Sequence, residues 1–211
     1  MIDTEVMTTI QDALQEPADG GATFPSGLWT QTEVLHRMNE RQNRFLKATQ
    51  AQVGVVWLDV AAGVRRVQLP PDWLTTLDVR WRPTGGAWTL LLRSDSFETD
   101  HALPGWSTNT GTPEVYMDED APLLQVQIAP APPVAGQLEV LYIPQGEEMT
   151  GTGDVLLQVP DEMAAGAVKY GALADLLNKD GRGKSPERAA YCELRYRLAE
   201  QVVGLLLAGR A

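Results

Sequence analysis

The sequence predicts an α+β fold, in which a helical bundle built from both ends of the chain carries an inserted antiparallel β subdomain. Two observations lead to this prediction. The last fifty residues contain two helices whose apolar residues recur every three or four positions, as in the buried stripe of a helix pair. Residues 52–159 instead hold short β-branched and aromatic runs separated by Gly and Pro, which is typical of strands and turns.

The two C-terminal helices have recognisable starts. The first follows Pro160, and the second follows Ser185 as N-cap with Pro186 at its first helical position. Their expected seam consists of Met163, Ala167, Tyr170, Ala174 and Leu177 on the first helix, and Ala189, Cys192, Tyr196, Ala199, Val203 and Leu206 on the second. Because such a seam must be covered, both helices are expected to pack in a bundle.

The apolar end of the second helix extends beyond this seam. Leu205, Leu207 and Ala208 form a candidate docking tail, because Leu205 and Leu207 fall outside the heptad positions and need another partner. A subunit or docking interface and ordinary burial against the β region are both compatible with this pattern.

The N-terminal quarter predicts an arm followed by one helix. Residues 1–25 are polar and end in a cluster of Pro and Gly, so we expect a flexible arm, with a short helix near residues 4–14 as one option. Thr30 and Glu33 match a capping box, which predicts a helix over residues 30–49. Residues 26–51 and 160–211 therefore form the expected three-helix bundle.

The β-rich insertion is expected over residues 52–159. Candidate strands lie at residues 52–60, 64–69, 77–81, 87–91, 114–117, 124–128, 138–143 and 155–159. Pro83-Thr84-Gly85-Gly86 has turn chemistry, so the strands on either side of it are expected to form a hairpin. Alternation in the strands at 124–128 and 138–143 places one face of each inward.

Charge and composition disfavour several classes of function. The net charge is −11, and residues 52–159 hold five basic and fourteen acidic side chains. Such a chain is a poor candidate for gripping nucleic acid, although an acidic surface suits a channel through which DNA slides. No apolar run approaches the roughly 18 residues of a membrane span, and the N-terminus has no secretory-signal pattern.

Catalytic and metal-binding patterns are not found. The chain has two histidines, His36 and His101, which argues against a paired metal site or a histidine-based triad. We therefore expect no enzyme, no cofactor and no metal. Of the six tryptophans, Trp81, Trp88 and Trp106 offer an alternative as sugar-stacking residues of a β-rich carbohydrate-binding module, although burial is the ordinary role of such side chains.

Several short motifs share their order with a known family. They are Trp29-Thr30-x-x-Glu33-Val34-Leu35, Pro71-Asp72-Trp73-Leu74, Gly105-Trp106, Gly111-Thr112-Pro113-Glu114-Val115-Tyr116, Ile128-Ala129-Pro130-Ala131-Pro132, Gly136-Gln137-Leu138-Glu139-Val140-Leu141-Tyr142, Val159-Pro160-Asp161-Glu162 and Tyr170-Gly171-Ala172-Leu173-Ala174. In this order, over residues 24–207, the sequence resembles the head-to-tail adaptor (connector) proteins of tailed bacteriophages.

The resemblance implies a structural role in the virion neck. Such adaptors form a ring, usually of twelve copies, beneath the portal protein; they link capsid to tail or nozzle proteins and line the DNA exit channel used in ejection. It implies synthesis in the host cytoplasm, no membrane partner and no catalytic residues. Another virion ring protein, such as a tail terminator or baseplate component, is the alternative within the same particle.

Overall fold

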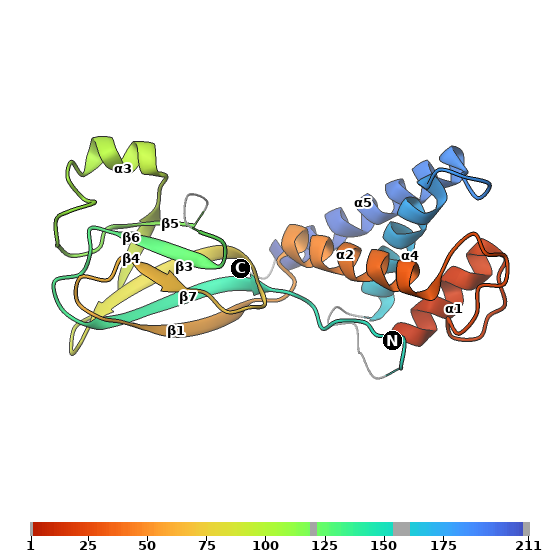
Figure 1. Ribbon diagram of the computed structural model, residues 1–211, viewed down its shortest axis with the longest axis horizontal. Helices are drawn as coiled ribbons and strands as arrows, with labels where there is room; N and C mark the ends of the chain where they lie inside the picture. Colours follow the sequence, from red (N-terminus) through yellow and green to blue (C-terminus); the bar gives the residue numbers. More distant parts are fainter. Residues whose placement is uncertain (1, 119–121, 154–160, 209–211) are drawn as a thin grey trace. The chain divides into compact units, whose positions relative to one another are not determined.

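The computed structural model describes the backbone of residues 2–118, 122–153 and 161–208, and their side chains except those of 161–165 and 208. The chain divides into two compact units: a helical unit of Met1–Gln52 with Gln145–Ala211, and a β unit of Val53–Pro144. Figure 1 shows the helices of both chain ends in the first unit and the strands in the second. The predicted α+β class, with terminal helices and a central β region, is confirmed.

The described part of the helical unit holds four helices, where the sequence predicts three. They are α1 (Asp3–Leu14), α2 (Gln31–Thr49), α4 (Asp161–Asn178) and α5 (Pro186–Ala208). The hydroxyl of Thr30 accepts a hydrogen bond from the backbone N–H of Glu33 and caps α2. The Glu33 carboxylate, which a capping box would bond to the backbone N–H of Thr30, instead pairs with the ammonium of Lys179 at 2.8 Å.

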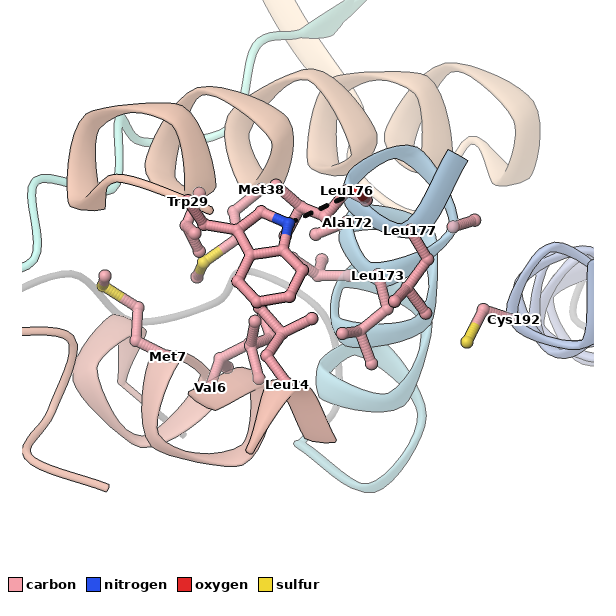
Figure 2. Packing of buried hydrophobic residues seen from close by; sticks show 14 of the residues in the cluster. Val6, Met7, Leu14, Trp29, Met38, Ala172, Leu173, Leu176, Leu177 and Cys192 are labelled. Carbon is pink, nitrogen blue, oxygen red and sulfur yellow. Dashed lines mark hydrogen bonds between the residues drawn. The ribbon is translucent and has the colours of Figure 1, made fainter. Parts of the chain in front are cut away.

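The core of the helical unit draws on all four helices (Figure 2). Trp29 lies near its centre, is 6% exposed and donates its indole N–H to the carbonyl of Leu176 at 3.4 Å. Around it pack Val6, Met7, Ile10 and Leu14 of α1, Val34 and Met38 of α2, Val168, Ala172, Leu173, Leu176 and Leu177 of α4, and Ala189 and Cys192 of α5. One continuous apolar core therefore joins both ends of the chain.

The N-terminal segment differs from the expected flexible arm. Val6, Met7 and Ile10 are fully buried, because their three- and four-residue spacing gives α1 an apolar stripe that the core covers. The following loop is also tied down: the side chains of Thr23 and Gln11 hydrogen-bond the Asp19 carboxylate and lower its pKa to about 2. The short helix named as an option near residues 4–14 is therefore present as α1.

The segment that returns from the β unit is held along α2 by side-chain amides. Asn39 makes two bonds to the backbone of Met149, donating to its carbonyl at 3.0 Å and accepting from its N–H at 2.8 Å. Gln42 donates to the carbonyl of Glu147, and Asn43 accepts from the N–H of Gly146. These bonds place residues 145–149 in the helical unit, whereas the sequence assigned residues 52–159 to the insertion.

The same returning segment is also bonded to α1. The Asp3 carboxylate accepts from the backbone N–H groups of Gly151 and Gly153 at 2.7 and 3.0 Å. Asp3 itself is fully buried, so these bonds satisfy a charge that would otherwise be costly to bury. The predicted strand at residues 155–159 lies outside the described residues.

The β unit is a seven-stranded sheet in the order β1-β7-β3-β4-β5-β6-β2. Its strands are β1 (Gly54–Val60), β2 (Arg66–Gln68), β3 (Trp73–Pro83), β4 (Thr89–Arg93), β5 (Val115–Met117), β6 (Gln125–Ala129) and β7 (Gly136–Pro144). The predicted hairpin is present, with Val79 opposite Leu91. The inward alternation predicted for residues 138–142 is also present, since Leu138, Val140 and Tyr142 are buried.

One pairing departs from the predicted antiparallel arrangement. β4 and β5 are parallel, which makes the sheet mixed. Parallel neighbours need a crossover connection, and here it contains the short helix α3 (Ser96–Ala102). All seven strands contribute to one apolar cluster, so the sheet curls around its own inner face, with the tryptophan ring of Trp81 close against Gly136.

We predict that α1 is an integral part of the folded helical unit. Ile10→Ala should lower the free energy of unfolding by about 2–5 kcal/mol, because it removes a fully buried side chain from a packed core. Asp12→Ala, on the exposed side of the same helix, is the control and should change stability by less than about 0.5 kcal/mol. Urea unfolding measures both, and equal stabilities would restore the flexible-arm interpretation.

Candidate assembly interface

The predicted seam residues line the contact between α4 and α5 over most of its length. Ala167, Ala174, Leu177, Ala189, Cys192, Tyr196 and Val203 are buried, with at most 6% of each residue exposed. Tyr170 and Ala199 are half-buried. The ring of Tyr170 meets that of Tyr191 edge-on, with 6.3 Å between centroids. The structure therefore brings these residues together as one helix–helix contact.

The two ends of the predicted seam stand apart from this contact. The side chain of Met163 lies outside the described residues. Leu206, expected in the seam, is 52% exposed. It lies about 30 Å along α5 from Pro186, whereas the 18 residues of α4 span only about 27 Å. The last turn of α5 therefore extends past the helix that covers the rest of the seam.

α4 is buried on more sides than the seam predicts. Val168, Ala172, Leu173 and Leu176 are at most 2% exposed and face the cluster shared with α1 and α2. The heptad spacing predicts only one buried face, whereas α4 is apolar nearly all round. Such a composition is itself the signal of a central helix.

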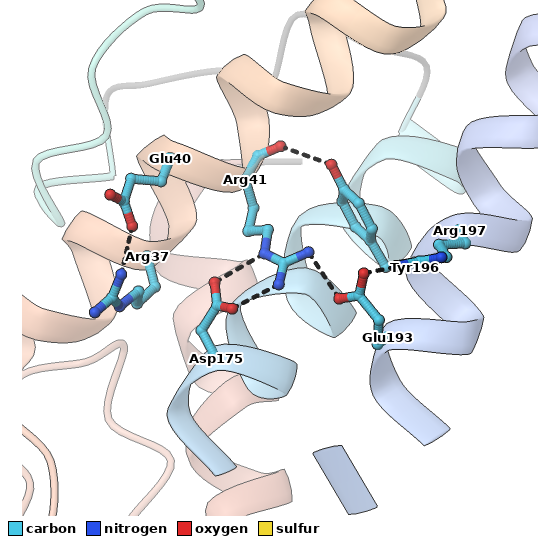
Figure 3. A network of polar contacts seen from close by, with 7 residues as sticks. All are labelled: Arg37, Glu40, Arg41, Asp175, Glu193, Tyr196 and Arg197. Atoms are coloured by element: carbon cyan, nitrogen blue, oxygen red, sulfur yellow. Dashed lines mark hydrogen bonds and ion pairs between the residues drawn. The ribbon is translucent and has the colours of Figure 1, made fainter. Parts of the chain in front are cut away.

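Arg41 connects α2 to both C-terminal helices (Figure 3). Its guanidinium donates to the two oxygens of the Asp175 carboxylate at 2.8 and 2.5 Å, and to Glu193 at 2.8 Å. The Arg41 side chain is 9% exposed, against 28% and 26% for its two partners. Two carboxylates thus compensate one nearly buried cation, and the three side chains connect α2, α4 and α5.

Tyr196 completes this junction. Its hydroxyl donates to the backbone carbonyl of Arg41 at 3.3 Å, and the guanidinium of Arg41 lies 4.8 Å from its ring centroid. Burial raises the pKa of Tyr196, so the side chain stays neutral. A side chain at Gly171 would meet Tyr196 and Arg41 at 2.8 and 2.9 Å; the glycine is what lets three helices approach closely here.

The outer face of α5 carries a second apolar stripe. Tyr191, Leu194, Leu198, Val202 and Leu205 are between 41% and 75% exposed. Their spacing of three, four, four and three residues puts them on one side of the helix, which differs from the side of the buried seam. Leu205 of the predicted docking tail belongs to this stripe; Leu207 is half-buried, and the Ala208 side chain lies outside the described residues.

A shallow groove adjoins this outer stripe. It has a volume of about 220 Å³ and is lined by Gly166, Tyr170, Arg195, Leu198, Ala199, Val202 and Val203. Gly166 leaves it open, since nothing lies within 4 Å of where its Cβ would stand. A contiguous exposed apolar surface of this kind is typical of protein–protein contact. The sequence analysis identified only the C-terminal end of this exposed surface, although the regular spacing of the whole stripe is visible in the sequence.

Of the tryptophans proposed for sugar stacking, two are buried and Trp88 is half-buried. Trp81 and Trp106 are 1% and 8% exposed, and the guanidinium of Arg82 covers the ring of Trp88 at 4.5 Å. The exposed tryptophan of the β unit is instead Trp57, at 60%. It lies on the outer face of β1 and donates its indole N–H to Glu139.

The described residues show neither a metal site nor a membrane-spanning helix. Among the described residues, no group of three or more His, Cys, Asp or Glu side chains is arranged to hold a metal ion. None of the described helices is long and apolar enough to cross a membrane. His36 pairs with Glu40 on the surface of α2, and His101 lies against the ring of Phe97.

Comparison with known proteins gives one family. The model of the family described as SU10 adaptor protein matches residues 4–205, which include parts of both units. Among solved structures, a chain in the neck of an empty GTA particle, computed with C6 symmetry, is similar at 15% identity and a TM-score of 0.30. That match covers 93% of this chain and 91% of the other. No curated protein matches.

We predict that the Arg41 junction stabilises the helical unit. Arg41→Met should lower the free energy of unfolding by about 2 kcal/mol, because it leaves two carboxylates without their shared cation. The destabilisation is not larger because water partly solvates both carboxylates. Arg37→Met removes an exposed pair with Glu40 and should cost less than about 1 kcal/mol. Urea unfolding at neutral pH compares them, and equal effects would exclude a special role for Arg41.

The same junction should make stability depend on pH. Burial alone would raise the pKa of Glu193, but hydrogen bonds from Arg197 and Arg41 outweigh it and hold that pKa low. A carboxylate with a lowered folded-state pKa stabilises the fold above its unfolded-state value and loses this contribution as the pH falls. The free energy of unfolding should therefore decrease as the pH falls below about 4, and it should decrease less in Arg41→Met. The prediction is contradicted if the wild type loses no more stability than the variant over this pH range.

Proposed function

The chain belongs to the SU10 adaptor family and is a structural head-to-tail adaptor of the tailed-phage type; from this premise we propose that it forms a ring beneath the portal in the virion neck. In this arrangement the ring, of twelve copies, links the capsid to tail or nozzle proteins and surrounds the channel through which DNA leaves. The role is non-enzymatic. Synthesis takes place in the host cytoplasm, before assembly.

The exposed stripe on α5 is the observation that supports assembly most directly. The helical unit already has a continuous core, so Tyr191, Leu194, Leu198, Val202 and Leu205 are not needed to complete it. Leaving five large apolar side chains in water is costly for an isolated chain, and covering them on a partner recovers roughly 1.5–3 kcal/mol for each fully buried one. We assign this stripe, with the tail that follows, to portal docking.

Charge supports the conduit part of the proposal. The β unit carries five basic and eleven acidic side chains, a net charge of −6. A ring of such units around a channel repels the phosphate backbone, so DNA passes without adhering. A ring also requires two different surfaces on each copy that meet by rotation. α5 has one buried and one exposed apolar stripe, and the exposed stripe could supply a surface for such contacts between subunits.

We predict that the tagged protein, purified from its native producing cells during particle assembly, brings the portal and tail components with it. Native mass spectrometry of the portal-bound species should give twelve adaptor copies. A complex with tail terminator or baseplate proteins but no portal would contradict the proposed position in the neck, and a different copy number would contradict the twelvefold ring alone.

We predict that Leu205→Asp weakens portal docking at least tenfold and leaves the fold intact, because Leu205 is 75% exposed in the free chain and would be desolvated in the complex. Deletion of residues 205–211 should act in the same direction. Ala190→Asp, at an exposed position of α5 outside the stripe, is the matched control. Circular dichroism checks folding, and normal portal capture by a folded Leu205→Asp chain would refute this assignment.

A further inference from the structure

A hollow in the β unit gathers two arginines that have no acidic partner among the residues that the structure describes. It has a volume of about 500 Å³ and is lined by Gly63, Val64, Arg65, Arg66, Trp106, Ser107 and Gln127. Arg66 donates through Nε to the side-chain oxygen of Gln127 at 2.9 Å. Arg65 donates through Nη2 to the carbonyl of Asn109 at 3.3 Å. Neither has a carboxylate oxygen within 4.0 Å in the described part of the chain.

Other arginines of the β unit are compensated differently. Arg80 pairs with Glu139 at 3.3 Å, and Arg93 pairs with Asp118 at 3.0 Å. Arg82 is bonded to Gln137 at 2.6 Å and lies over the ring of Trp88. The unit has six more acidic than basic side chains, so carboxylates are abundant. Arg82 also has no carboxylate partner among the described residues, but only in this hollow do two adjacent arginines lack one.

The hydrogen bonding of Arg65 is also incomplete. Its Nε is buried and has no acceptor among the described residues. An unsatisfied buried donor is unusual in a folded protein and costs free energy. An oxyanion in the adjoining hollow would compensate the charge of both guanidinium groups, because such groups bind planar carboxylates through paired, charge-assisted hydrogen bonds.

We propose that this hollow binds a carboxylate side chain of an acidic polypeptide segment. Arg65 and Arg66 supply the positive charge, and the hydroxyl of Ser107 supplies a further donor. Trp106 forms a fixed wall, since it is 8% exposed and its indole N–H is already bonded to Asp100 at 2.6 Å. The site follows from the β unit alone and does not depend on the ring or on the portal.

A protein carboxylate fits this site better than DNA does. Binding of nucleic acid requires several clustered Lys and Arg side chains on a surface of positive electrostatic potential. Here two arginines lie in a unit of net charge −6, which repels an extended polyanion but leaves enough positive charge for one carboxylate. At an ionic strength of about 0.15 M the general repulsion is screened beyond about 8 Å, whereas direct contacts inside the hollow persist.

The test uses the full-length chain and a hexaglutamate peptide, with hexaglutamine as the uncharged comparison. Isothermal titration calorimetry at physiological ionic strength should show saturable binding of hexaglutamate and none of hexaglutamine. Arg66→Gln should weaken this binding at least tenfold. Arg80→Gln, which removes an exposed arginine elsewhere in the same unit, should bind within twofold of the wild type. Arg65→Gln should behave like Arg66→Gln if circular dichroism shows that it folds.

Three results would overturn the proposal. The first is the absence of saturable hexaglutamate binding. The second is equal affinity for hexaglutamate in the wild type and the Arg66→Gln variant. The third is tighter binding of a short DNA duplex that is lost in the same variant, since this would make the hollow a phosphate site. All three results can be obtained independently of the portal-capture experiment, so this proposal and the proposed function can fail separately.

Discussion

The helical unit is organised by the burial of α4, which has neighbours on nearly every side. Its seam meets α5, and Val168, Ala172, Leu173 and Leu176 meet the residues of α1 and α2. Gly171 leaves room for the Arg41 side chain and the Tyr196 ring to approach its backbone. Because the N-terminal helices pack on this C-terminal helix, the core of the helical unit needs both segments of the chain.

The Arg41 junction makes that packing selective. Apolar surfaces alone tolerate several arrangements of helices, whereas a nearly buried guanidinium requires its carboxylates at defined positions. Asp175 and Glu193 come from different helices, so an alternative packing would leave charges uncompensated. The well-defined interior leaves the outer stripe of α5 free to serve as a surface for assembly, which suits a head-to-tail adaptor.

Much of the secondary structure followed from local chemistry. Thr30 and Pro186 located the starts of two helices, and the turn at residues 83–86 located the hairpin between β3 and β4. The family was also recognisable from ordered motifs, as the match over residues 4–205 bears out. A short helix near residues 4–14 was one option from the sequence, but its packing through Val6, Met7 and Ile10 was not predicted, because the core that covers them is built from distant segments.

The sequence by itself determined the order of the elements, because capping residues, turn residues and apolar periodicity act over a few neighbouring positions. Tertiary structure alone decided which carboxylates meet Arg41, since these partners lie 134 and 152 positions further along the chain. It also decided that β4 and β5 run parallel and that Leu206 stays exposed beyond the helix covering its neighbours. Those outcomes depend on the relative lengths and the long-range packing of complete elements, which local sequence signals do not carry.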